Sequence, residues 1–140
     1  MSPAPDPRTI RGRAGRDAED VALRFLEALG WLVLARNLAV GRDEIDLVCL
    51  DTDGPALVCV EVRGHSTNRF GAAEESVDNR KLVRNHRAAM TLVRSGWVPE
   101  HGLSARIPWR VDVIAVELRP SLARDLGGPA VRHIRGVTLD

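Results

Sequence analysis

The sequence predicts an α/β fold in which a mixed central sheet has helices on both faces. Three observations support this prediction. One segment near the N-terminus has apolar residues at helical spacing. Two later segments are apolar at nearly every position, which is typical of strands covered on both faces. The predicted elements follow the order helix, three strands, helix, strand (αβββαβ), and a chain of 140 residues is long enough for one domain.

The first helix is expected from about Arg13 to Leu29. Its apolar residues recur at spacings of three and four, and Gly30 follows as a stop signal. They are Ala18, Val21, Ala22, Phe25, Leu26 and Leu29. Residues 1–10 contain three prolines and no apolar run, unlike a secretory signal. We therefore assign residues 1–11 to a disordered tail and residues 12–140 to a single domain.

Three strands are expected after this helix, followed by a second helix and a fourth strand. The turn Gly41-Arg42 separates the first two strands, and Ser76 or Asp78 can cap the second helix. A segment near the C-terminus could add an edge strand. The expected strands are residues 31–38, 44–50, 56–63 and 109–118, the second helix ends near Arg94, and the edge strand lies within 130–139.

The loop between the second and third strands sets their register. Pro55 has no amide hydrogen to close a two-residue turn, so we expect a longer loop with Asp51 facing Ala56. If the hairpin is symmetric, this pairing places Asp46 directly opposite Glu61. Directly opposed Cβ atoms lie about 4.5–5.5 Å apart, close enough for two carboxylates to share one cation.

Asp46 and Glu61 are the acidic residues that interrupt these apolar strands. Burying an unpaired charge costs several kcal/mol, so each needs a partner. Mg²⁺ prefers oxygen ligands and is usually held by one or two carboxylates with several waters. We therefore predict a divalent-metal site, with Arg63 on the face of Glu61 to stabilise negative charge on a phosphate. The alternative is a buried salt bridge between Arg63 and one of these carboxylates, with a structural role alone.

Two further groups of charged residues could extend this site. Glu19 lies at the edge of the apolar stripe of the first helix and could reach a cleft beside the sheet. An arginine row on the second helix, opposite its apolar side, could follow a phosphate backbone. For both groups the alternative is a solvated helix surface. The row consists of Arg80, Arg84, Arg87 and Arg94.

Composition excludes several other classes of protein. A net charge of +1 gives no global basic field, so a nucleic-acid site must come from local clustering. No run approaches the roughly 20 apolar residues that span a membrane. Cys49 and Cys59 are expected to be buried on opposite faces rather than to form a disulfide or zinc site, as is typical of the cytoplasm. The four histidines show no metal-ligand spacing.

The chain resembles the YraN-like family of small bacterial proteins over about residues 12–116. The resemblance rests on the joint order and spacing of short motifs. They are Gly15 with Glu19 and Ala22, Leu34-Ala35-Arg36-Asn37, Glu44-Ile45-Asp46-Leu47-Val48, Val60-Glu61-Val62-Arg63, Phe70-Gly71, Lys81 and Arg110-Val111-Asp112-Val113. The family has the PD-(D/E)XK restriction-endonuclease-like fold and is related to Holliday junction resolvases. The resemblance thus implies a restriction-endonuclease-like core.

The resemblance also implies an activity. Asp46 and Glu61 would bind Mg²⁺, with Mn²⁺ as a substitute, and Glu19 would assist. The implied protein is a Mg²⁺-dependent endonuclease that acts on branched or structured DNA, and a homodimer would suit a two-fold symmetric junction. The motif lysine falls on Arg63, which cannot readily lose a proton to act as a base. Lys81 could supply an amine if the second helix faces the cleft.

The replacement of the motif lysine by Arg63 leaves two other functions open. One is a module of nuclease fold that binds nucleic acid without cleaving it. The other is a protein-interaction domain in which the acidic pair has only a structural role.

Overall fold

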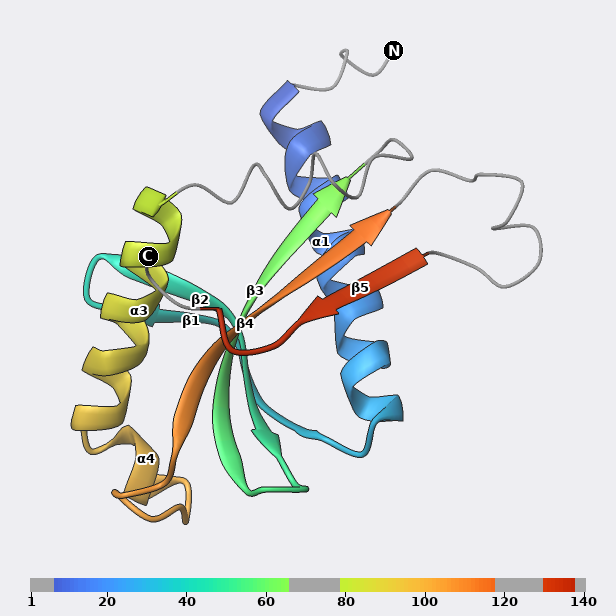
Figure 1. Cartoon of the computed structure of the whole chain (residues 1–140). Helices are drawn as coiled ribbons and strands as arrows, with labels where there is room; N and C mark the ends of the chain where they lie inside the picture. Colours follow the sequence, from blue (N-terminus) through green and yellow to red (C-terminus); the bar gives the residue numbers. More distant parts are fainter. Residues whose placement is uncertain (1–6, 66–78, 118–129, 138–140) are drawn as a thin grey trace.

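The structure, a computed structural model, describes residues 7–65, 79–117 and 130–137. It contains a five-stranded sheet with α1 against one face and α3 against the other (Figure 1). The elements are α1 (Pro7–Ala28), β1 (Leu32–Val40), β2 (Asp43–Asp51), β3 (Ala56–His65), α3 (Asn79–Arg94), α4 (Trp97–Glu100), β4 (Trp109–Glu117) and β5 (Ala130–Ile134). The predicted α/β class with a mixed sheet is confirmed.

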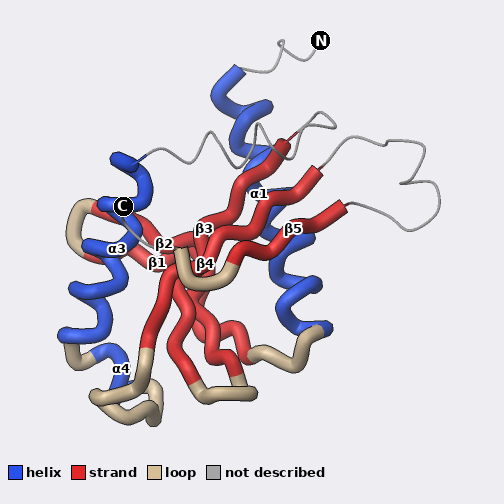
Figure 2. The backbone as a smooth tube through the Cα atoms, in the orientation of Figure 1, coloured by secondary structure: helices blue, strands red, loops and turns tan. Residues whose placement is uncertain are grey.

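The strands lie in the sheet in their chain order, β1-β2-β3-β4-β5 (Figure 2). Neighbouring strands are antiparallel except for β3 and β4, which are parallel. A parallel pair needs a crossover connection, and α3 lies in that connection. The short helix α4 is an addition to the predicted order, whereas β5 is the edge strand that we expected within residues 130–139. Phe70, Gly71, Ser76 and Asp78, which we had singled out from the sequence, lie outside the described residues.

Two apolar clusters fill the space between the sheet and its helices. The stripe predicted for the first helix packs on one face except for Leu29, which is exposed, and Ala88, Ala89 and Leu92 of α3 pack on the other. The buried members of the α1 cluster are Ala18, Ala22, Leu26, Trp31, Leu47, Cys49, Val58, Val60, Ile114 and Val116. Those of the α3 cluster include Val40, Ile45, Val48, Leu57, Cys59, Val98 and Val111.

Helix α1 begins at Pro7 rather than near Arg13. Proline suits the first turn of a helix because its fixed φ is helical and its missing amide hydrogen would have no partner there. Residues 7–11, which we had expected in the tail, are therefore helical, and residues 1–6 lie outside the described part of the chain. None of the described helices has the length and apolar character needed to cross a bilayer.

Both cysteines are free and buried, in different clusters. Burial raises the pKa of each thiol to about 12, with a smaller contribution from the nearby charge of Asp112. The prediction that the two side chains point to opposite faces is confirmed.

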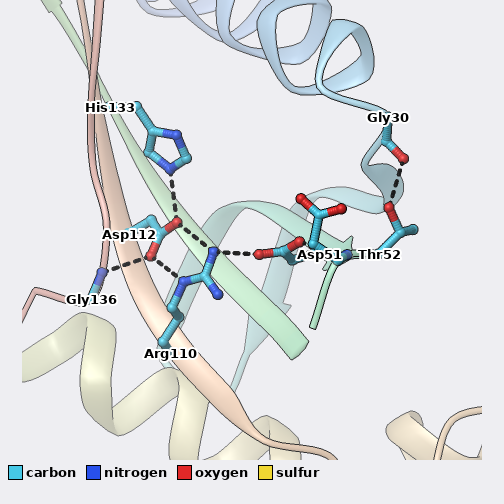
Figure 3. Close-up of polar contacts among 8 residues, drawn as sticks. Gly30, Asp51, Thr52, Arg110, Asp112, His133 and Gly136 are labelled. Carbon is cyan, nitrogen blue, oxygen red and sulfur yellow. Dashed lines mark hydrogen bonds and ion pairs between the residues drawn. The ribbon is translucent and has the colours of Figure 1, made fainter. Parts of the chain in front are cut away.

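A buried polar network joins β2, β4 and β5 on the α1 face of the sheet (Figure 3). Asp112 of β4 is fully buried and accepts hydrogen bonds from Arg110 Nε at 3.0 Å, His133 Nε2 at 2.8 Å and the Gly136 amide at 2.9 Å. Arg110 also donates to Asp51 at 2.9 Å. Since Asp112 receives several donors, its buried charge is compensated.

Candidate metal and nucleic-acid site

An open pocket of about 280 Å³ lies where β2 and β3 meet α3. Its lining holds four carboxylates, four basic side chains and one amide. They are Arg42, Asp43, Glu44, Asp46, Glu61, Arg63, Lys81, Arg84 and Asn85. The carboxylates all come from the strands, whereas Lys81 and Arg84 come from the helix. A pocket with carboxylates on the strands and basic side chains on α3 can bind a positively charged and a negatively charged group together, such as a metal ion with a phosphate.

Asp46 and Glu61 meet in this pocket, although not in the predicted way. The register set by Asp51 and Ala56 is confirmed as far as the pair Leu47 and Val60, where the described ladder ends. Asp46 and Glu61 are therefore not a ladder pair. Instead, the Val62 amide donates a hydrogen bond to Asp46 Oδ2 at 2.8 Å.

The two carboxyl groups line the same pocket and lie close enough for the charge of one to affect the other. Burial, followed by the charge of Glu61, raises the pKa of Asp46 to about 7. The Val62 amide and Arg63 oppose this increase. Two carboxylates this close cannot both ionise cheaply, and a divalent cation between them would remove that cost.

An irregularity in the sheet directs the Asp46 side chain. Ile45 and Leu47 would share a face in a regular strand, but Ile45 packs beneath α3 and Leu47 beneath α1. On the neighbouring strand Asn37 has a φ of 49°, a left-handed conformation that asparagine tolerates better than most residues. In the described part of the chain, the β1–β2 ladder omits both Asn37 and Asp46. Local irregularities of this kind re-aim side chains beside functional sites.

Glu19 lies near Asp46 but does not line the pocket. The side-chain amide of Asn37 donates to Glu19 Oε2 at 3.2 Å. Burial raises the pKa of Glu19, and the charge of Asp46 raises it further. Glu19 thus approaches Asp46 from α1, while the rest of the site faces α3.

Arg63 lies beside Glu61, as strand alternation predicted. Its Nη2 is 3.0 Å from Glu61 Oε1, and the Arg63 and Glu61 side chains are 20% and 15% exposed. Among the described residues, neither Nε nor Nη2 of Arg63 has an acceptor with hydrogen-bond geometry. The guanidinium is therefore held by charge while two of its nitrogens keep hydrogen-bonding capacity.

The predicted arginine row divides between different environments. Lys81 and Arg84 line the pocket, whereas Arg80 is exposed outside its lining. Arg87 donates two hydrogen bonds to Asp43, at 3.0 and 2.9 Å. This ion pair occupies the Arg87 side chain that the sequence had suggested for a phosphate backbone.

The donor set fits a hard divalent cation with few protein ligands. The described residues contain no group of three or more His, Cys, Asp or Glu side chains arranged to hold a metal. Asp46 and Glu61 provide two carboxylates, a number that Mg²⁺ sites commonly use. Both carboxylates line the same pocket and the charge of Glu61 acts on Asp46, which suits a shared cation.

Sequence reasoning missed three residues near the acidic pair: Asn37, Arg42 and Asn85. Asn85 follows Lys81 by four positions, which puts both on one helix face. This spacing could have identified Asn85 as a residue of the site. Arg42 was noted only as a turn residue. Asn37 was noted only as part of a family motif, and its role could not be recognised because it depends on a left-handed conformation.

Comparison with known proteins identifies the family. The model of the "Uncharacterised protein family UPF0102" matches residues 18–116. The chain belongs to the UPF0102 family. This result confirms the resemblance to the YraN-like proteins, and the matched range includes Glu19, Asp46, Glu61 and Arg63.

Several UPF0102 relatives are similar over most of their length. One from Pseudomonas savastanoi is 40% identical over 122 residues, which is 86% of this chain and 92% of the relative. Another, from an Arthrobacter species, is 40% identical over 88% of this chain and 93% of its own. A third, from Frankia casuarinae, is 41% identical over 87% and 92%.

Proposed function

We propose that this UPF0102 protein is a Mg²⁺-dependent DNA endonuclease that acts on branched DNA in the manner of Holliday junction resolvases. The supporting observation is the Asp46–Glu61 pair, whose carboxyl groups line one pocket beside Arg63 and the basic side chains of α3. A structural salt bridge would need one carboxylate. A cation bound by both groups explains why a second carboxylate is present. It also explains why a buried carboxyl group with a raised pKa, Asp46, lies in the pocket.

Each residue has a role in phosphodiester hydrolysis. Bound Mg²⁺ would polarise the phosphate and lower the pKa of the attacking water. Asp46 and Glu61 hold the cation in their deprotonated forms, and Glu19 adds negative charge behind Asp46. Arg63 stabilises the charge that develops on the phosphate oxygens. Lys81 and Arg84 bind the phosphates that flank the cleaved bond.

Cleavage of a panel of labelled DNAs tests this proposal. Four-way junctions, flaps, nicked duplexes and plain duplexes would be incubated with Mg²⁺, Mn²⁺ or EDTA. We expect metal-dependent cleavage that favours branched DNA. Asp46→Asn or Glu61→Gln should reduce the rate roughly 100-fold or more, the scale on which single electrostatic contributions act.

Asp53→Asn is the matched control, because Asp53 is an exposed aspartate in the β2–β3 turn, away from the pocket. It should cleave at the wild-type rate. Cleavage that continued undiminished in Asp46→Asn and Glu61→Gln would rule out the proposed mechanism. The homodimer stays a prediction, which the molecular mass in solution would test.

A second candidate function is nucleic-acid binding without cleavage. Arg63 favours it, because an arginine at this position cannot act as a base at neutral pH. DNA binding that weakens with salt but gives no product, even in Arg63→Lys, would support the binding function instead.

A further inference from the structure

Asn85 lies beside the acidic pair on the inner side of α3. It lines the pocket of about 280 Å³ described above, together with Glu61 and Arg63. It also lines a much smaller cavity, of about 10 Å³, again beside Glu61. Asn85 is thus the neutral polar side chain in a pocket whose other lining residues are all charged.

Asn85 Nδ2 is buried and has no hydrogen-bond acceptor among the described residues. In this pocket Nε of Arg63 also lacks an acceptor among the described residues, and Nη2, although it forms the ion pair with Glu61, lacks one in hydrogen-bond geometry. Buried N–H groups in native proteins nearly always have a partner, so unpaired ones indicate a missing ligand or water. All three nitrogens are donors, so the ligand they suit presents acceptor oxygens.

The charges around the pocket indicate which acceptor this is. Lys81 and Arg84 of α3 and Arg42 of the β1–β2 turn surround these donors, which favours an anion. A cation between Asp46 and Glu61 would place positive charge on the acidic side as well. The anion would then lie between the cation and the donors of Arg63 and Asn85.

We propose that Asn85 is a positioning residue that, with Arg63, donates hydrogen bonds to a non-bridging oxygen of the bound phosphodiester. This inference rests on the proposed function and adds a substrate contact to it. An amide suits the place because it donates to phosphate without an ionic attraction to Glu61. A lysine there would pair with Glu61 and compete with the metal.

Fluorescence anisotropy of a labelled four-way junction in EDTA measures this contact apart from metal binding. Asn85→Asp keeps the side-chain shape but replaces the donor with a negative charge, so we expect binding at least about tenfold weaker. Asn85→Leu removes the donor without adding charge, and binding should weaken several-fold. Thr91→Asp adds the same charge on α3 outside the pocket that Asn85 lines. Its affinity for the junction should be within twofold of the wild type.

Cleavage and thermal unfolding complete the test. In Mg²⁺, Asn85→Leu should raise KM more than it lowers kcat. The rise in melting temperature caused by Mn²⁺ should persist in Asn85→Asp, since Asp46 and Glu61 are intact. Wild-type affinity in both Asn85 variants, or an equal loss in Thr91→Asp, would overturn the inference while leaving the proposed function in place. A wild-type protein that neither binds DNA nor responds to Mn²⁺ would overturn both.

Discussion

Among single residues, Asp46 has the pKa that most affects the chemistry of the site. Burial and the neighbouring charge of Glu61 raise this pKa to about 7, so Asp46 is only partly ionised near neutral pH in the absence of metal. A metal ion must displace the Asp46 proton, and metal affinity should therefore increase as the pH rises through about 7.

The raised pKa also affects stability. The pKa of Asp46 is about 7 in the folded protein against an ordinary value of 3.8. The native state thus holds the proton more tightly, and this stabilisation is complete below about pH 4 and lost as the pH rises toward 7. Without metal, Asp46→Asn should be more stable than the wild type at pH 8, by about 2 kcal/mol, and the difference should shrink at pH 5.

Urea unfolding in EDTA at several pH values measures this difference. Asp53→Asn serves as the control, since its carboxylate is exposed in a turn. If the wild type and Asp46→Asn kept the same stability difference from pH 5 to pH 8, the raised pKa of Asp46 would have no support.

Among the elements, those with local signals were predicted best. The apolar periodicity of the first helix and the turn residues around Pro55 located α1, β2 and β3, and Pro55 also gave the correct register near the turn. The end of the ladder before Asp46 was missed, because the turn residues fix the register only close to the turn. The buried network around Asp112 was missed too, since Asp51, Arg110 and His133 are distant in sequence and come together only in the folded sheet.

The buried network is the element-scale feature with the clearest consequence for stability. Removing one partner of a buried charge pair typically costs about 3–5 kcal/mol. Asp112 is fully buried and receives donors from β4, β5 and the residues after β5. Asp112→Asn should therefore lower the free energy of unfolding by about 3 kcal/mol at pH 7. Asp17→Asn, on the exposed side of α1, should change it little.

The pH dependence gives this prediction a second readout. Burial alone would raise the pKa of Asp112, but hydrogen bonds from His133, Gly136 and Arg110 outweigh it and lower the pKa below 3.8. The stabilisation by this carboxylate is thus present above about pH 4 and lost as the pH falls through the lowered pKa. In urea unfolding, the difference in free energy of unfolding between the wild type and Asp112→Asn should become smaller at acid pH. If this difference stayed constant down to pH 2, the lost stability would come from packing rather than from the charge of Asp112.

At the scale of the whole molecule, the site joins elements from both sides of the sheet. The strands β2 and β3 lie between α1 on one face and α3 on the other (Figures 1 and 2). Asp46 and Glu61 come from these strands, the basic side chains come from α3, and Glu19 of α1 is linked to the site by Asn37. These elements come together only in the folded chain. A cation bound by them is a ligand of the native state alone, so it must stabilise the whole fold.

Thermal unfolding with Mn²⁺ measures that coupling. A ligand at 100 times its Kd stabilises the native state by about 2.7 kcal/mol, which raises the melting temperature of a domain of this size by roughly 5–10 °C. The rise should be saturable, larger at pH 8 than at pH 6 because of proton competition, and absent in Asp46→Asn and Glu61→Gln. Asp53→Asn should respond like the wild type. If Mn²⁺ stabilised all four proteins equally, the cation would bind outside the acidic pair, and the proposed endonuclease would have no metal where its phosphate is expected.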